Sequence, residues 1–321
     1  MPKEIAHISL AQKVFRHLPE NSLFLGSIKK HFNLFLYGSI APDTCYYYLL
    51  GPHSSFIQNQ SKKFHTTDTS SLLPVLNFLK HFPDNDPKAM AFAAGICCHI
   101  MTDTLFHPMI YYFSGMEDQH TDATTRHRLI ETALDIHFWS LSKIDTSIFI
   151  DYIFNNLEIR GTELIHFFEY LFSLEKNKWE RSLKYALKYH IFSYQLFKNH
   201  TLYRIIQFFH GYKFGIPSKY ESLFYPSSNP VELSFFSGRI HYRNPIKGTP
   251  ITTNIEALIQ KTIKQVLILI SILETALIYR QELSDVIHHP NLPKISPCLS
   301  KETFMFWNGQ ADIRRIIYKR L

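Results

Sequence analysis

Glycine is scarce in this chain, at 11 of 321 residues, and no long stretch alternates between apolar and polar residues. A sheet of any size is therefore not expected. Internal repeats and low-complexity segments are also lacking. Because 45% of the residues are hydrophobic and 15% aromatic, the chain can bury a sizeable core. Its long segments follow a helical period, so the sequence predicts an all-α protein.

Segments that target or anchor a protein are lacking as well. Residues 1–7 contain no basic start followed by an apolar core, so no secretory signal is evident. The most apolar run, Val266–Leu273, is bounded by Lys264 and Glu274. A bilayer core needs about 20 apolar residues, which this run does not supply. We therefore expect no transmembrane span and a cytoplasmic protein.

Cysteine is rare too, with Cys45, Cys97, Cys98 and Cys298 as the complete set. None of these residues has the paired spacing of a cysteine metal site. The adjacent pair, Cys97 and Cys98, is poorly placed for a structural disulfide. We expect all of them to be free and buried.

Charge is unbalanced toward the basic side, with a formal net charge of +7 and a pI of about 9.0. Such a balance favours anionic partners, among them phosphorylated headgroups, nucleic acid and acidic membrane surfaces. A solvated, lysine-rich surface that keeps the protein soluble explains the same charge.

The most informative stretch runs from His99 to His107 and carries His99, Asp103 and His107 at four-residue spacing. On a helix these side chains point in one direction. The segment before them, Ala91–Cys98, is apolar enough to lie in the interior. Buried imidazoles and carboxylates need partners, and a divalent ion such as zinc satisfies both groups.

A second pair, His127 and Glu131, repeats this spacing on the next expected helix. Asp43 and His65 lie in loops upstream, and His7 lies close to the start of the chain. The other histidines lack a carboxylate at metal spacing, and we interpret them as core or surface residues. The first trio and the five residues His127, Glu131, Asp43, His65 and His7 make eight candidate ligands. One tetrahedral ion uses fewer, so the pattern indicates a cluster of two or three ions.

The expected organisation is one domain over residues 1–321, with a metal-binding half (1–145) and an aromatic helical half (146–321). Helices are expected at 7–18, 71–81, 88–113, 124–141, two or three times within 147–209, and at 253–283. The basic end, 313–321, is expected either to form a last short helix or to lie on an acidic partner.

Between the expected helices, residues 215–253 are rich in proline and aromatic residues and predict a long ordered loop. Two roles stay open for its aromatic side chains, which would either line a pocket mouth or pack on the helices. These side chains are Phe224, Tyr225, Phe235, Phe236 and Tyr242.

Taken in chain order, the eight candidate ligands resemble the ligand series of the zinc-dependent phospholipase C family. The segments Gly38–Asp43 and Ala91–Asp103 also look like the N-terminal catalytic part of the glycosylphosphatidylinositol-specific phospholipases D. S1/P1 nucleases share the same metal core. The resemblance covers roughly residues 1–145. It implies a multi-helix bundle of the phospholipase C/P1 nuclease kind, with the metal cluster in its core.

The resemblance also implies which residues share each ion. A first zinc would be bound by Asp43, His65, His99 and Asp103. A second zinc would be bound by His107, His127 and Glu131. Asp103 would also reach toward a third ion, together with His7.

In secreted members of the family, an N-terminal tryptophan completes the third site. This chain has no tryptophan before Trp139. A third ion would therefore have to use backbone groups of Met1 or Pro2, or the third site would be empty.

The activity implied is zinc-dependent phosphodiester hydrolysis, in which a hydroxide that bridges two metals attacks a phospholipid. Asp43 would orient that hydroxide or act as a general base. The substrate would be a phospholipid or another phosphodiester, with peripheral contact to an anionic membrane.

Two alternatives stay open. An S1/P1-like nuclease or other phosphoesterase suits the positive charge, although the missing tryptophan makes nucleic acid the less favoured substrate. A non-catalytic protein that zinc stabilises for binding is the other alternative.

Overall fold

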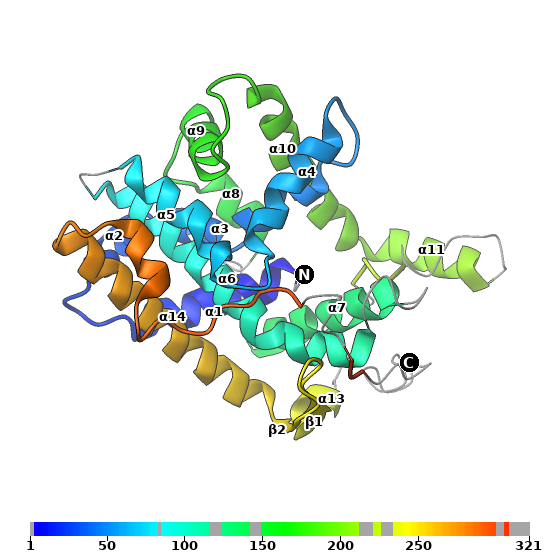
Figure 1. Ribbon diagram of the computed structural model, residues 1–321. Coiled ribbons are helices and arrows are strands. Elements are labelled where there is room, and N and C mark those ends of the chain that lie inside the picture. The colour runs from blue at the N-terminus through cyan, green and yellow to red at the C-terminus, as the bar shows by residue number, and fades with distance from the viewer. Residues whose placement is uncertain are drawn as a thin grey trace.

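The computed structural model describes residues 3–82, 85–115, 123–141, 149–211, 221–225, 234–299 and 305–307. Regular structure in these ranges is helical apart from one short hairpin (Figure 1). The prediction of an all-α fold is confirmed. The basic segment 313–321 and parts of the expected loop 215–253 lie outside the described residues.

The helix at the centre of the fold is α6 (Pro87–Ser114). It begins where the side chain of Asp86 accepts hydrogen bonds from the amides of Lys88 and Ala89, as an N-cap residue does. Apolar residues surround the helix on all sides, which is typical of a helix enclosed by its neighbours. Cys97 and Cys98 lie within it, free and buried as expected, whereas Cys298 is free but only half-buried.

Length and composition alone would allow α6 to cross a membrane, but nearly all of its most apolar stretch is buried inside the protein. This finding departs from the expectation that no segment is long and apolar enough. The polar ligands at positions 99, 103 and 107 interrupt the apolar residues of α6, so the sequence does not show one continuous apolar run there. Its burial indicates the core helix of a folded domain.

Among the described residues, five α-helices of the first half and one of the second half pack against α6. They are α1 (Glu4–His17), α2 (Leu23–Lys30), α3 (Phe32–Gly38), α5 (Leu73–Lys80), α7 (Ala123–Leu141) and α14 (Ile255–Ile278). Figure 1 shows α1 and α14 crossing the region around α6, although they lie at opposite ends of the sequence. The core is therefore built from both halves of the chain.

Shorter elements connect and cover this core. In the first half these are η1 (Ala41–Tyr47), α4 (Ser54–Ser61), η2 (Lys62–Phe64) and η3 (Thr69–Leu72). In the second half they are α8 (Ile150–Asn155), α9 (Gly161–Leu171), α10 (Glu180–Phe197), α11 (His200–Gly211), α13 (Ser234–Ser237) and η5 (Leu283–His288). Helix α10 packs against η1, which brings it close to one of the candidate ligands.

The described part of the expected loop is more regular than predicted. It contains α13 and an antiparallel hairpin of β1 (Ile240–Arg243) and β2 (Pro250–Thr253), with Ile240 opposite Thr253. The prolines and the short strands conceal this hairpin from a search for long alternating patterns. Asn254 then caps α14, since its side chain accepts a hydrogen bond from the Ala257 amide at 2.7 Å.

The aromatic residues of this region pack inward. Phe224, Tyr225, Phe236 and Tyr242 are all buried, and Phe235 lies edge-on to a phenylalanine of α6. Of the two roles considered for them, packing on the helices is the one observed.

Candidate metal centre

The fold brings the eight predicted ligands together from five elements. Helix α1 carries His7, η1 carries Asp43, and His65 directly follows η2. Helix α6 supplies His99, Asp103 and His107, and α7 supplies His127 and Glu131. The four-residue spacing works as expected, because it turns the ligands of each helix toward the same side.

A first cluster forms around one carboxylate oxygen of Asp103. Its Oδ2 lies 3.1 Å from Nε2 of His65 and 3.3 Å from Nε2 of His99. Oδ1 of Asp43 completes the group at 3.2 Å from the His65 nitrogen and 3.8 Å from the His99 nitrogen. Ligands of a tetrahedral zinc with bonds of about 2.0–2.1 Å lie about 3.3 Å apart. The observed spacings suit such an ion.

The second oxygen of Asp103 faces different side chains. Its Oδ1 lies 3.4 Å from Nε2 of His7 and 3.5 Å from Nε2 of His107. The rings of His7 and His99 stack with their centroids 4.3 Å apart. Asp103 is thus positioned to link two groups of ligands.

A further group joins α6 to α7. Nε2 of His127 lies 2.7 Å from Oε1 of Glu131, and the rings of His107 and His127 are 5.8 Å apart. The ligand atoms of these three residues lie within 4.8 Å of one another, so they could hold an ion. Met1 and Pro2, the expected source of backbone ligands for a third ion, lie outside the described residues.

Backbone carbonyls orient three of the imidazoles. The carbonyl of Ser39 lies 3.0 Å from Nδ1 of His99, and that of Ser61 lies 2.9 Å from Nδ1 of His65. His107 has the same contact with the carbonyl of Pro297. Because a carbonyl only accepts hydrogen bonds, each Nδ1 carries a proton, and each Nε2 faces the cluster as the nitrogen available to a metal. Metal-binding histidines are oriented in this way.

Several buried polar atoms in the cluster fit a cation. Within the described residues, no hydrogen bond satisfies either carboxylate oxygen of Asp103, Oδ1 of Asp43, or Nε2 of His7 and His107. Leaving such atoms buried without a partner is costly. A divalent ion bound by carboxylates and imidazoles removes that cost. The donor set therefore fits zinc.

The electrostatics of the cluster also favour a cation. Burial by itself raises the pKa of Asp103, but the neighbouring His107 and His99 hold it well below the ordinary value. Burial lowers the pKa of His65, whereas contacts with Asp103 and Asp43 outweigh it and raise that pKa to about 10. A metal at this position therefore competes with a proton, which makes its affinity dependent on pH.

Sequence reasoning missed Asp135, which fixes the start of α1. Its buried carboxyl group accepts hydrogen bonds from the amides of Ile5 at 3.2 Å and Ala6 at 2.8 Å. The hydroxyl of Tyr225 donates a third at 2.6 Å. The sequence does contain a signal for this residue, because Asp135 follows Glu131 by four residues, the same spacing that separates His127 from Glu131. By capping α1 from α7, Asp135 positions His7.

Sequence reasoning also missed a buried chain of polar contacts behind η1. Nε2 of His190 lies 3.2 Å from Oε1 of Glu4, and its Nδ1 lies 3.1 Å from the hydroxyl of Thr44. Thr44 is the neighbour of Asp43. No local pattern predicts a contact between residues 186 positions apart. This chain of contacts anchors η1 to both α1 and α10.

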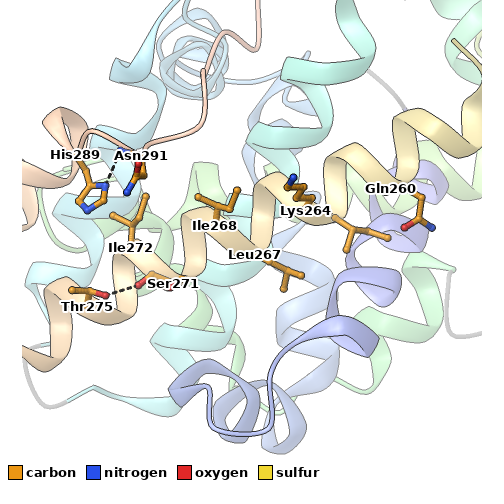
Figure 2. A pocket seen from close by; sticks show the side chains of 10 residues that line it. Gln260, Lys264, Leu267, Ile268, Ser271, Ile272, Thr275, His289 and Asn291 are labelled. Carbon is orange, nitrogen blue, oxygen red and sulfur yellow. Dashed lines mark hydrogen bonds between the residues drawn. The ribbon is translucent and has the colours of Figure 1, made fainter.

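A separate groove of about 800 Å³ runs along α14, away from these ligands. Figure 2 shows its side chains, with Lys264 and Gln260 toward one end and His289 and Asn291 toward the other. His289 is its one metal-type side chain among the described residues, so the groove does not resemble a metal site.

Comparison with known proteins agrees with the geometry. A family model described as zinc dependent phospholipase C matches residues 6–194. The chain belongs to the zinc-dependent phospholipase C family. All eight clustered residues fall inside the match, which extends beyond residue 145 through α8 and α9 into α10. No curated protein and no solved structure matched the chain. As a member of this family, the chain is expected to be a zinc-dependent hydrolase.

Proposed function

We propose that this zinc-dependent phospholipase C family member hydrolyses the phosphodiester bond of a phospholipid at the cluster around Asp103. The observation that carries the proposal is the position of Asp103, whose two oxygens face separate sets of imidazoles at 3.1–3.5 Å. A carboxylate so placed is suited to bridge metal ions. Two-metal sites act on phosphodiesters in many hydrolases.

In this proposal Asp43, His65, His99 and Asp103 bind one zinc, while His107, His127 and Glu131 bind a second. His7 and Asp103 are the side chains available to a third. Zinc bound there would lower the pKa of water and neutralise charge that builds up on the phosphate. The number of ions is two or three.

Asp43 is the side chain assigned to proton transfer. Burial raises the pKa of Asp43, but the neighbouring His99 and His65 outweigh burial and hold that pKa below its ordinary value. Its carboxylate is therefore ionised, as a general base requires. Its side chain keeps 9% of its surface exposed, whereas that of Asp103 keeps none. Asp43 therefore lies at the accessible edge of the cluster, where it would take a proton from the attacking water. That proton would then pass to the diacylglycerol oxygen as its bond to phosphorus breaks.

The test measures phosphocholine release from phosphatidylcholine micelles, and hydrolysis of bis(nitrophenyl) phosphate, with added zinc. Asp103→Asn should lower both rates by about 100-fold or more. Asp285→Asn is the matched control, since Asp285 is an exposed aspartate of η5, and it should leave both rates unchanged.

Two outcomes would contradict the proposal. Faster cleavage of a single-stranded oligonucleotide than of any phospholipid would indicate the nuclease alternative. Zinc-loaded protein without turnover on any of these substrates would indicate the non-catalytic alternative.

A further inference from the structure

The loop between η1 and α4 exposes two adjacent leucines. Leu49 keeps 67% of its surface exposed and Leu50 keeps 77%. In Figure 1 this loop projects from the molecule beside α4. Transfer of such a side chain out of water is favourable, because it removes apolar surface from contact with water. An exposed apolar pair at a projecting tip is typical of a surface that meets an apolar partner.

Hydrogen bonds hold this tip in a fixed shape. The side-chain amide of Gln58 donates to the carbonyl of Tyr48 at 2.8 Å, and the Tyr48 hydroxyl donates to the carbonyl of Pro52 at 3.3 Å. Gly51 adopts φ +143°, and a β-carbon there would lie 2.2 Å from the Tyr48 hydroxyl. The leucines are therefore presented by an ordered turn, which lowers the entropic cost of binding.

Aromatic residues extend the apolar surface away from the tip. Phe56, which is 39% exposed, stacks on Trp179 with ring centroids 4.3 Å apart. Tyr185 lies further along α10 with 36% of its surface exposed, and its ring lies 6.0 Å from that of Tyr189. Tryptophan and tyrosine are the side chains enriched at the interface between lipid and water.

Cations lie directly over these rings. Lys178 is 5.9 Å from the ring of Trp179, while Arg181 and Lys188 lie 5.7 Å and 6.0 Å from the ring of Tyr185. Five cationic and two acidic residues occur between positions 175 and 188. Both acidic residues form ion pairs with lysines of the same segment. The remaining charge is positive and complements anionic headgroups.

The element that carries a candidate catalytic residue leads directly into the tip. Asp43 lies in η1, and Leu49 follows the last residue of η1 by two positions. At about 2 Å per residue within η1 and at most about 3.5 Å per residue beyond it, the two positions lie at most about 15 Å apart. Asp43 and His65 each keep 9% of their side-chain surface exposed, whereas His99 and Asp103 keep none. A surface that binds the tip would therefore lie close to the accessible edge of the cluster.

We infer that the tip (residues 48–56), with Trp179 and the cationic face of α10, docks on an anionic phospholipid bilayer. The leucines would enter the boundary between headgroups and acyl chains, while Arg181 and Lys188 would contact phosphates. This inference rests on the proposed function, because it assigns the surface from which a phospholipid substrate reaches Asp43.

The test is sedimentation of the full chain with vesicles of phosphatidylcholine, alone or with 30% phosphatidylserine. The wild type should bind the anionic vesicles about tenfold more tightly or better. Leu49→Ser/Leu50→Ser should weaken that binding by about tenfold or more. Arg181→Gln/Lys188→Gln should remove the preference for phosphatidylserine. Ile278→Ser/Tyr279→Ser is the control, since this exposed apolar pair lies at the end of α14 and should have no effect.

Two activity measurements separate this inference from the proposed function. Leu49→Ser/Leu50→Ser should hydrolyse soluble bis(nitrophenyl) phosphate at the wild-type rate, and Asp103→Asn should still sediment with anionic vesicles. If the wild type binds vesicles but hydrolyses no substrate, the proposed function is wrong, whereas the docking surface is still supported. Equal vesicle binding by wild type and the leucine variant would overturn the inference. So would a wild-type dimer that the leucine variant abolishes, because a second copy would then cover the tip.

Discussion

Gly38 and Gly95 hold α3 and α6 so close together that neither residue has room for a side chain. A β-carbon on Gly95 would lie 2.1 Å from the carbonyl oxygen of Phe35, and one on Gly38 would lie 2.4 Å from that of Phe92. The contact comes one turn before His99 and just before Ser39, whose carbonyl orients the His99 ring. Close backbone packing thus sets the position of a metal ligand.

Gly95→Ala should therefore disturb both stability and metal binding. Overpacking of this kind costs about 1–3 kcal/mol of the free energy of unfolding, and zinc affinity should fall because the Ser39 carbonyl moves away from His99. Urea unfolding with and without zinc measures both effects. Gly26→Ala is the control, since nothing lies within 4 Å of a β-carbon there. Inside α2 the alanine should stabilise by about 0.5–1 kcal/mol. Equal stability of the two variants would contradict the role of the glycine contact.

Asp135 should make stability depend on pH between about 4 and 8. Burial, together with the charge of Glu4, raises its pKa to about 8. The folded state therefore keeps a proton that the unfolded state loses above its ordinary pKa near 3.8. Stability falls as pH rises through this window, by at most about 1.4 kcal/mol per pH unit. The pKa of Lys3 is lowered to about 8, so Lys3 affects the pH dependence of stability mainly above pH 8.

Asp135→Asn should remove this slope, because asparagine does not titrate. Urea unfolding at pH 5 and pH 8, with chelator present in both, compares the variant with the wild type. Relative to the wild type, the variant should have a higher free energy of unfolding at pH 8 than at pH 5. Parallel pH profiles for the two proteins would show that Asp135 is ionised in the folded state throughout.

Removal of metal should destabilise the protein. Without a cation, the carboxylates of Asp43 and Asp103 and their buried imidazoles lose the partner that their geometry fits. Zinc at 1,000 times its dissociation constant would add about 4 kcal/mol to the free energy of unfolding. Scanning calorimetry should show a melting temperature that chelator lowers and excess zinc restores. The melting temperature of Asp103→Asn should respond less to both additions. A wild-type melting temperature that chelator does not change would argue against a structural contribution of metal.

The ligand-bearing helices could be predicted because their chemistry is local in sequence. His99, Asp103 and His107 follow the helical period on α6, and His127 and Glu131 follow it on α7, so spacing alone aligns them. Their convergence with Asp43 and His65 followed from the family resemblance. The contacts that orient them are not local. The carbonyl of Pro297 reaches His107 across 190 positions, and only the folded chain brings the two together.

Zinc content of the purified protein, measured by plasma mass spectrometry after equilibration with zinc and removal of free metal, tests the cluster most directly. A bridging Asp103 predicts two or three zinc ions per chain in the wild type. The double variant His127→Ala/Glu131→Gln should hold one fewer, and Asp285→Asn should match the wild type. Fewer than two zinc ions per chain in the folded wild type would contradict the bridged metal centre and the hydrolysis proposed for it.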